Sequence, residues 1–321
     1  MRSFNSLDEC LKDVSTVAIS GHVRPDGDCV GSCMAVYNYI LENYPEIKAE
    51  VYLEKIPGAL EFLQGTSEVL HTSEENKKFD LFIALDCGET GRLGFSSKYF
   101  ETAGRTICID HHISSSGMAD ENVIEPGYSA TCEVLYELLD NERISSTVAE
   151  ALYTGIIHDC GVFQYTNTSP RTMRIGAALI EKGIPFTKIV EESFYQKTYH
   201  QNRILGNTLL KSELACDGKV IWAVVDKSEM EHFQVTSADL DGIVSQLRNT
   251  KGVEVAIFLY ETGEKEYKAS MRSNGSVNVS RIAVSFGGGG HIKAAGCGMK
   301  GTSEEVIETL VEQIKNQLTQ E

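Results

Sequence analysis

The stretch GHVRPDGDCVGS, residues 21–32, places one histidine and two aspartates within seven residues. These side chains, His22, Asp26 and Asp28, come directly after the apolar run TVAI. Imidazole and carboxylate groups are costly to bury unless they are paired or hold a cation. Because Pro and Gly in the same stretch indicate a turn at a strand end, the residues form either an ordinary polar turn or half of a metal site.

Further acids and histidines close other apolar runs. Asp86 ends DLFIALD, Asp110 ends RTICID and is followed by His111 and His112, and Asp159 follows ALYTGIIH. A single Asp at such a position is often only a helix N-cap. Separate segments that bring carboxylates to one sheet edge favour divalent cations, since like charges at short range otherwise force protonation.

The number and type of these side chains indicate the chemistry. Carboxylates mixed with imidazoles, with no need for thiolates, suit Mn²⁺ or a related ion better than structural zinc. Two metal ions roughly 3.5–4 Å apart can bind a hydroxide between them and hold the phosphorus that it attacks. The sequence therefore predicts two Mn²⁺ ions with a shared carboxylate and the hydrolysis of phosphoesters. The six candidate ligands are His22, Asp26, Asp28, Asp86, His111 and Asp159.

A second candidate site is FGGGGHIKAAG, residues 286–296, in which four glycines precede His291. Backbone amides of such a loop can approach a phosphate closely. A flexible turn is the alternative, but IKAAG resembles a helix start and the loop lies in a basic segment, so we favour substrate binding. Residues 265–300 carry one acid, Glu266, in a chain of net charge −17, and six basic residues: Lys265, Lys268, Arg272, Arg281, Lys293 and Lys300.

The elements that must position these residues follow from the apolar pattern. Strands are expected at 16–20, 49–53, 80–86 and 105–110, with helices at about 29–44, 58–63, 130–139 and 148–158. This alternation predicts an α/β fold with a doubly wound, mainly parallel sheet, whose ligand site lies beyond the carboxyl ends of the strands.

The second half predicts a smaller α/β domain. A helical region at 171–204, interrupted at 183–185, precedes expected strands at 219–226, 253–261 and 267–273 and a final helix at 303–318. The expected domains are residues 1–191 and 205–321, joined by a linker or hinge at 192–204.

Composition excludes several classes of protein. The net charge of −17 argues against binding to long nucleic acid. No apolar run approaches the roughly 20 residues of a membrane helix, and the N-terminal MRSFNSLDECLKDV predicts an amphipathic helix rather than a signal peptide. Nine cysteines without a CxxC motif predict free thiols and a cytoplasmic location, and the pair Cys29 and Cys33 is weak evidence for zinc.

With these residues in view, the chain resembles the DHH phosphoesterase superfamily, which is named for the triplet present here as Asp110, His111 and His112. HVRPDGDCVGS, ALDCGETGRLG, IDHHISS and GIIHDCGVF resemble the family's four motifs in order. MRSNGSVNVSRIA followed by GGGGHIKAAGCG resembles the DHH-associated C-terminal domain. The resemblance covers nearly the whole chain and implies a metal-dependent hydrolase.

Within the superfamily, the length and the GGGGH loop resemble the nanoRNase and pAp-phosphatase group. These Mn²⁺ enzymes cleave very short oligoribonucleotides and remove the 3′-phosphate of adenosine 3′,5′-bisphosphate (pAp). The resemblance implies the same substrates here, with attack of a metal-bound hydroxide on phosphorus. Another substrate (a cyclic dinucleotide, a single-stranded DNA end or pyrophosphate), a non-enzymatic nucleotide sensor and a homodimer are left open.

The resemblance also implies how the ligands divide. His22, Asp26 and Asp86 would hold one ion. Asp28, His111 and Asp159 would hold the other, with Asp86 bridging the two.

The remaining roles concern catalysis and the substrate. Asp110 would orient a ligating imidazole, and His112 would contact the scissile phosphate. Arg272 would pair with a substrate phosphate or stack on a base. The terminal nucleotide would be bound by Gly288, Gly289, Gly290 and His291. Arg92, Asn167, Thr168 and Arg171 are weaker candidates, because a solvated surface or a helix cap explains them equally well.

Overall fold

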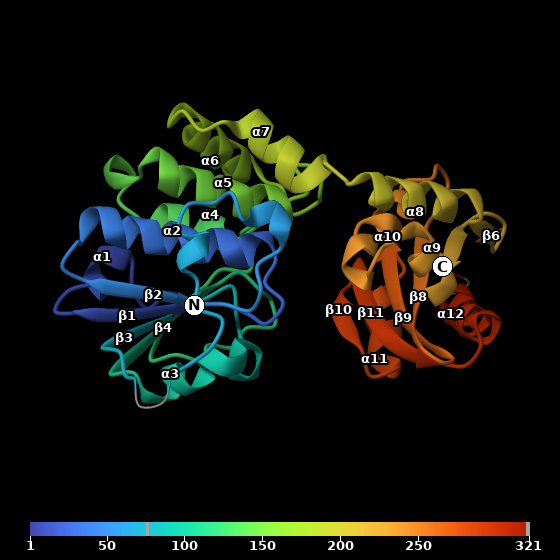
Figure 1. Ribbon diagram of the computed structural model, residues 1–321, viewed down its shortest axis with the longest axis horizontal. Coiled ribbons are helices and arrows are strands. Elements are labelled where there is room, and N and C mark those ends of the chain that lie inside the picture. The colour runs from blue at the N-terminus through green and yellow to red at the C-terminus, as the bar shows by residue number, and fades with distance from the viewer. Residues whose placement is uncertain (75–76, 319–321) are drawn as a thin grey trace. The chain divides into compact units, whose positions relative to one another are not determined.

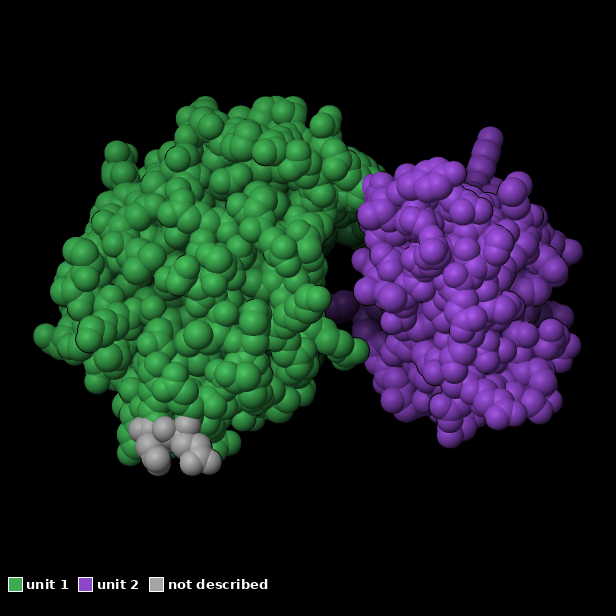
Figure 2. Space-filling model, in the orientation of Figure 1, with its two compact units in different colours: residues 1–196 green, residues 197–321 purple. Residues whose placement is uncertain are grey.

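The computed structural model describes residues 1–74 and 77–318, and the chain forms two compact units, residues 1–196 and 197–321 (Figures 1 and 2). The boundary falls inside the segment 192–204 that we predicted as a linker. Most of that segment is helical rather than extended, because a π-helical turn covers Glu191–Tyr195 and a capping box at Thr198 begins the next helix at Tyr199. Its role as a hinge stays a prediction.

Unit 1 contains a five-stranded sheet in the order β2-β1-β3-β4-β5, with every neighbouring pair parallel. The chain leaves β1 for β2 on one side and returns to β3 on the other, so the strand order reverses between β1 and β3. The doubly wound, parallel α/β sheet is confirmed. Its strands are β1 (Thr16–Ser20), β2 (Lys48–Tyr52), β3 (Leu81–Leu85), β4 (Arg105–Asp110) and β5 (Glu121–Ile124).

Helices cover both faces of this sheet, which is why its central strand β3 is apolar throughout (Figure 1). Val17 and Ile19 of β1 belong to the large core under the helices α2, α4 and α5, whereas Ala18 belongs to a smaller core with Tyr99 of α3. The helices of unit 1 are α1 (Leu7–Cys10), α2 (Gly27–Asn43), α3 (Ser97–Thr102), α4 (Thr131–Leu138), α5 (Ser146–Asp159), α6 (Pro170–Glu181) and α7 (Phe186–Val190). Short 3-10 turns lie at Gly58–Leu60, Thr66–Glu68, Thr90–Ser96 and Asn141–Arg143.

Two helices expected in unit 1 were wrong: the one at about 58–63 is only a 3-10 turn at Gly58–Leu60, and the N-terminal one is much shorter than predicted. The N-terminal helix is only four residues long, from Leu7 to Cys10, because Arg2 bridges to Val123 and the amino group of Met1 donates to the carbonyl of Ile124. The strand β5 that these first residues contact was not predicted, since its four residues alone carry no clear alternation.

Helices α2 and α5 approach each other closely through glycine. A Cβ atom on Gly31 would lie 2.7 Å from the carbonyl oxygen of Ala151 and 2.9 Å from the amide nitrogen of Gly155. Such contacts do not occur between real atoms, so α2 requires glycine here. The close approach matters because these helices carry Asp28 and Asp159.

Unit 2 is the smaller α/β domain that we predicted, with a mixed six-stranded sheet in the order β10-β11-β9-β8-β7-β6. Its strands are β6 (Glu213–Ala215), β7 (Val220–Val225), β8 (Val255–Gly263), β9 (Glu266–Ser273), β10 (Gly289–His291) and β11 (Ala294–Lys300). Its helices are α8 (Tyr199–Leu210), α9 (Lys227–Phe233), α10 (Ile243–Arg248), α11 (Val279–Ser285) and α12 (Ser303–Leu318), with a 3-10 turn at Ser237–Leu240. Among the described helices of both units, none has the length and apolar character that a membrane crossing requires.

We expect Gly31→Ala to lower the free energy of unfolding by about 1–3 kcal/mol, because the new methyl group overlaps backbone of α5. Gly206→Ala on α8 is the matched control, since a Cβ atom there meets nothing within 4 Å, and it should be neutral or stabilising by up to about 1 kcal/mol. Urea unfolding of the full chain measures both. Equal stability of the two variants would contradict the proposed contact.

Candidate metal centre

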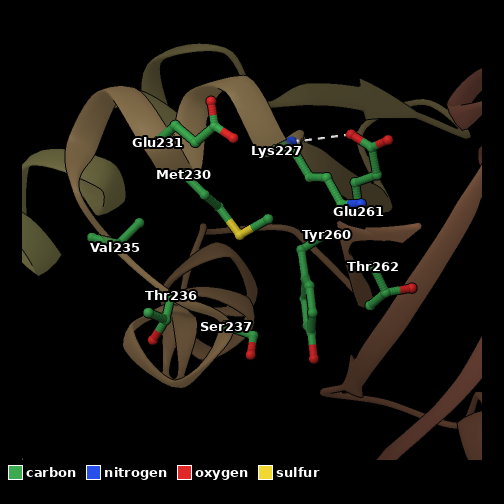
Figure 3. Close-up of a pocket in the computed structure, with 9 residues that line it drawn as sticks. All are labelled: Lys227, Met230, Glu231, Val235, Thr236, Ser237, Tyr260, Glu261 and Thr262. Carbon is green, nitrogen blue, oxygen red and sulfur yellow. Dashed lines mark hydrogen bonds between the residues drawn. The ribbon is translucent and has the colours of Figure 1, made fainter. Parts of the chain in front are cut away.

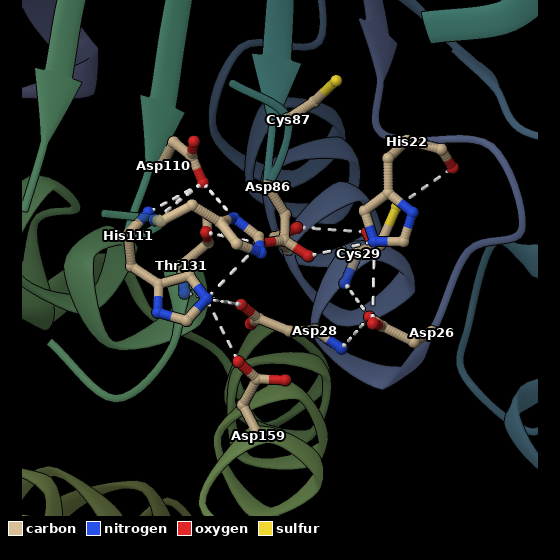
Figure 4. Close-up of polar contacts among 12 residues, drawn as sticks. His22, Asp26, Asp28, Cys29, Asp86, Cys87, Asp110, His111, Thr131 and Asp159 are labelled. Carbon is tan, nitrogen blue, oxygen red and sulfur yellow. Dashed lines mark hydrogen bonds and ion pairs between the residues drawn. The ribbon is translucent and has the colours of Figure 1, made fainter. Parts of the chain in front are cut away.

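One group of predicted ligands follows β1 and β3, on either side of the reversal in strand order. The Nε2 atom of His22 lies 3.4 Å from Oδ2 of Asp86 and 3.6 Å from Oδ2 of Asp26 (Figure 4). Asp26 is also the N-cap of α2, so the N-cap alternative is correct for this residue without excluding a ligand role. Ligand atoms of these three side chains all lie within 4.8 Å of one another.

The second group joins α2, the segment after β4 and the end of α5. The Nε2 atom of His111 lies 3.1 Å from Oδ2 of Asp159 and 3.9 Å from Oδ2 of Asp28. Ligand atoms of this group also lie within 4.8 Å of one another. Helix packing thus brings together residues that are 131 positions apart (159 − 28).

Asp86 lies between the two groups. Its Oδ2 atom faces His22 at 3.4 Å, and its Oδ1 atom faces Nε2 of His111 at 3.6 Å (Figure 4). The backbone of Asp86 has φ of 54°, a left-handed conformation that turns the chain sharply at the end of β3. One carboxylate with an oxygen toward each group has the arrangement of a bridging ligand.

Both histidines present Nε2 to the carboxylates because backbone carbonyls engage the other ring nitrogen. Nδ1 of His22 lies 2.9 Å from the carbonyl oxygen of Val23, and Nδ1 of His111 lies 3.3 Å from that of Tyr128. Protonation at Nδ1 leaves the Nε2 lone pair for a cation, as in most histidine metal sites. The buried Nε2 of His111 makes no hydrogen bond of good geometry within the described residues, which fits a metal ligand.

The electrostatics of the cluster also call for a cation. Burial, followed by the charges of Asp86 and Asp159, raises the pKa of Asp28 well above its usual value. Burial lowers the pKa of His22, but its hydrogen bonds with Asp26 and Asp86 outweigh this and raise that pKa to about 12. The carboxylates therefore need positive charge nearby. Protonated histidines supply it when no metal is bound, and divalent ions supply it when they bind.

Asp110 and His112 form a pair beside the two groups, and ligand atoms of His112, Asp86 and His111 also lie within 4.8 Å of one another. Asp110 accepts hydrogen bonds from the amides of His111 and His112, at 2.8 and 3.2 Å, and its Oδ1 atom lies 2.7 Å from Nδ1 of His112. Burial opposes ionisation of Asp110, but the hydrogen bond with His112 prevails and lowers the pKa of this carboxyl. Asp110 therefore orients the His112 ring, whose Nδ1 also lies 3.5 Å from Asp86.

Thr131 and the start of α4 also contact the cluster, and they were not predicted from the sequence. The amides of Thr131 and Cys132 donate to the two carboxylate oxygens of Asp28 at 2.6 and 2.9 Å, and the Thr131 hydroxyl donates to Asp86 at 3.1 Å. No side chain of its own caps α4, because Asp28 from another helix satisfies its first amides. A helix start without a local capping residue was the available signal.

The weaker candidates mainly support the backbone. Asn167 donates to the carbonyl oxygens of Ser129 and Asp159, both at 3.1 Å. Arg171 pairs with the buried Glu133 at 2.8 Å. The carbonyl oxygen of Arg92 accepts from the amide of Val23 at 2.7 Å, which holds the turn after His22. These contacts agree with the structural alternative for Asn167 and Arg171.

Cysteines do not enter the metal groups found among the described residues. All nine are free thiols, as predicted, and Cys29, Cys87 and Cys160, which follow Asp28, Asp86 and Asp159, are buried. They fill space behind the ligands as small apolar side chains.

The predicted substrate residues lie in unit 2. Arg272 of β9 pairs in register with Ala294 of β11, and Ala294 pairs with His291 of β10. The expected helix start after the glycines is wrong, because residues 289–300 form the hairpin β10–β11.

The glycines of this hairpin are also required by packing. A Cβ atom on Gly288 or Gly290 would lie 2.2 or 2.4 Å from a carbonyl oxygen of β11, whereas one on Gly289 would meet nothing within 4 Å. Close packing against β11 therefore requires glycine at 288 and 290, and only Gly289 of these three faces open space.

Unit 2 also contains an open pocket between α9 and the end of β8, lined by residues that include Lys227, Met230 and Tyr260 (Figure 3). None of the predicted site residues lines it.

The comparison with known families decides the relationship. The sequence matches the DHH family, N-terminal domain, over residues 16–156 and the DHHA1 domain over residues 217–320. The chain therefore contains an N-terminal domain of the DHH family followed by a DHHA1 domain. Five of the six ligand candidates fall within the first match, and Asp159 lies just after it. Arg272 and His291 fall within the second match.

Curated relatives match most of the chain. A Thermus thermophilus protein named bifunctional oligoribonuclease and PAP phosphatase NrnA is 29% identical, over 97% of this chain and 93% of its own length. Proteins of the same name from Mycoplasma genitalium and Bacillus subtilis are 27% and 24% identical, over 89% and 90% of this chain and 89% and 91% of their own lengths. Together with the DHH domain, they identify this chain as a hydrolase that acts on phosphoester bonds.

Solved structures agree on the fold. An exopolyphosphatase-related protein from Bacteroides fragilis superposes with a TM-score of 0.89 at 25% identity, covering 98% of this chain and 96% of that one. RecJ from Thermus thermophilus, at a TM-score of 0.53 and 12% identity, covers 98% of this chain and 54% of RecJ, and this likeness shows the fold alone.

We expect Asp86→Asn to abolish tight binding of Mn²⁺, because it removes the charge that both groups of ligands share. Asp140→Asn is the control, since Asp140 caps a distant 3-10 turn and should leave binding unchanged. Titration calorimetry on chelator-treated protein measures both. Unchanged Mn²⁺ affinity in Asp86→Asn would contradict the prediction that Asp86 is a metal ligand.

Proposed function

We propose that the chain hydrolyses short oligoribonucleotides to mononucleotides and removes the 3′-phosphate of pAp, using two Mn²⁺ ions. The names of the curated relatives support the substrates. The observation that carries the two-ion proposal is Asp86, which faces His22 with one oxygen and His111 with the other.

In this proposal, His22, Asp26 and Asp86 hold one ion, and Asp28, Asp86, His111 and Asp159 hold the other. When bound, the two ions would activate a water molecule and neutralise charge on the attacked phosphoryl group. The amides at the start of α4 keep the carboxylate of Asp28 in place through bonds of 2.6 and 2.9 Å. Backbone carbonyls keep Nε2 of both histidines directed at the carboxylates.

We assign His112 to the scissile phosphate. Its Nδ1 atom is engaged by Asp110 at 2.7 Å, an arrangement that fixes the ring and stabilises its protonated form. A protonated imidazole can donate a hydrogen bond to a phosphoryl oxygen as negative charge develops there. Asp110 thus acts through His112.

Unit 2 supplies the substrate-binding residues in this proposal. Arg272 pairs with a phosphate or stacks on a base, and His291 and the open backbone at Gly289 contact the terminal nucleotide. We assign metal-dependent catalysis to residues 1–191, a hinge to residues 192–204 and substrate binding to residues 205–321. The net charge of −17 supports a preference for short substrates, because the surface as a whole repels long RNA.

The experiment for this proposal measures product release from the dinucleotide pApA and from pAp, with Mn²⁺ and with a chelator, beside pyrophosphate and a twelve-nucleotide RNA. We expect AMP from the first two in Mn²⁺ alone and little product from the others. Rapid cleavage of pyrophosphate or of the long RNA would keep the metal site but overturn the proposed substrates. Binding of pAp without turnover would instead support a nucleotide sensor.

We expect His112→Asn to lower kcat for pApA by about 10²–10⁴-fold while leaving Mn²⁺ affinity unchanged, because the ring is assigned to the phosphate. Single-turnover kinetics and metal titration on the same sample separate the two effects. Loss of one equivalent of Mn²⁺ would make His112 a ligand, in line with its 3.5 Å distance from Asp86, and would contradict the assignment.

A further inference from the structure

The structure separates the basic residues that lie close together in the sequence between residues 265 and 300. Lys265 and Lys293 lie in turns, and Arg281 lies on helix α11. Lys300 forms an ion pair with Glu266 at 2.7 Å. The two remaining cations, Lys268 and Arg272, both lie on β9, within the sheet.

Strand register places Lys268 on the same face of the sheet as the predicted substrate residues. Residues paired across antiparallel strands point to the same face, and alternate residues of one strand do too. Arg272 pairs with Ala294, which pairs with His291. Lys268 is four residues from Arg272 on the same strand, so Lys268, Arg272 and His291 share one face.

Small residues form the floor between these side chains. On strands β9, β11 and β10, the row between Lys268 and Arg272 consists of Ser270, Gly296 and Gly289, paired in register. A Cβ atom on Gly296 would lie 3.7 Å from Cε of Lys268, so the lysine stem extends over this glycine toward the Arg272 row. Rows on one face are about 7 Å apart along a strand, and Lys268 and Arg272 lie two rows apart. The two cations therefore suit two different anionic groups rather than one.

No carboxylate of the described residues neutralises the charge of Lys268. Within residues 1–74 and 77–318, its ammonium group forms no ion pair or hydrogen bond, and the side chain is partly exposed. Lys300, in the next row of the same face, differs because Glu266 neutralises it. An ammonium group held over a bare glycine and left without a carboxylate is suited to bind an anion from solution.

We propose that Lys268 binds the non-scissile 5′-terminal phosphate of the substrate. This inference rests on the proposed function, which assigns the scissile phosphate to the metal-binding residues of unit 1. Both pAp and pApA carry a 5′-phosphate besides the group that is hydrolysed. Lys268 is therefore a specificity residue that makes the enzyme prefer substrates with a 5′-phosphate over those with a 5′-hydroxyl.

The test removes the 5′-phosphate of the substrate and the charge of Lys268 in separate comparisons. The wild-type chain and Lys268→Met, which keeps the stem over Gly296, are compared on pApA against ApA and on pAp against 3′-AMP. We expect the wild type to favour the 5′-phosphorylated substrate in kcat/KM by about 10-fold to 100-fold, the effect of one charge-assisted hydrogen bond. Lys268→Met should lose this preference and retain wild-type turnover of ApA. Lys268→Arg should keep most of the preference for the 5′-phosphate.

Lys300→Met is the matched control, because it removes the same charge on the same face from a lysine already paired with Glu266. It should keep the full preference for the 5′-phosphate. If Lys268→Met slows ApA as much as pApA, or if it slows neither, the inference is wrong while the proposed function stands.

A binding experiment keeps the inference testable if the proposed function fails. Titration of chelator-treated protein with AMP and with adenosine should show AMP bound about tenfold or more weakly by Lys268→Met than by the wild type, and adenosine bound equally by both. Equal binding of AMP by the two proteins would overturn the inference whatever reaction the enzyme catalyses. Absence of turnover of pApA and pAp by the wild type would overturn only the proposed function.

Discussion

Three aspartates that are at most 1% exposed, Asp28, Asp86 and Asp110, lie together at the carboxyl edge of one sheet, and this burial constrains the rest of unit 1. Buried carboxylates at short range cannot all stay ionised without compensating charge or hydrogen bonds. Each has a different compensation. Helix amides bind Asp28, the two histidine rings flank Asp86, and the amides of the following residues together with His112 bind Asp110.

The fold supplies these compensations through its topology and through close packing. The reversal in strand order between β1 and β3 places His22 and Asp86 side by side, where ligands of doubly wound sheets bind. The glycine contact between α2 and α5 then brings Asp28 and Asp159 to the same edge. In the proposed function, a divalent ion would complete an arrangement in which donors and charges are already in position, and it would supply the chemistry for hydrolysis of a phosphoester.

The sequence predicted which carboxylates and imidazoles lie close together, because such groups at the ends of buried strands are costly to bury unless they bind a partner. The parallel sheet follows from the same pattern, since β3 is apolar throughout and β4 is buried over all but its first residue. Contacts from distant segments could not be predicted in this way. Thr131 binds Asp28 from across the fold, and β5 is short and depends on pairing with the N-terminus. The hairpin β10–β11 was mistaken for a loop and helix start because glycine-rich strands carry no apolar alternation.

Anomalous diffraction from crystals of this chain grown with Mn²⁺ would show whether two ions share Asp86. We expect two manganese peaks roughly 3.5–4 Å apart, with the carboxylate of Asp86 between them and His22 and His111 on opposite sides. A single peak, or two peaks that do not share Asp86, would contradict it.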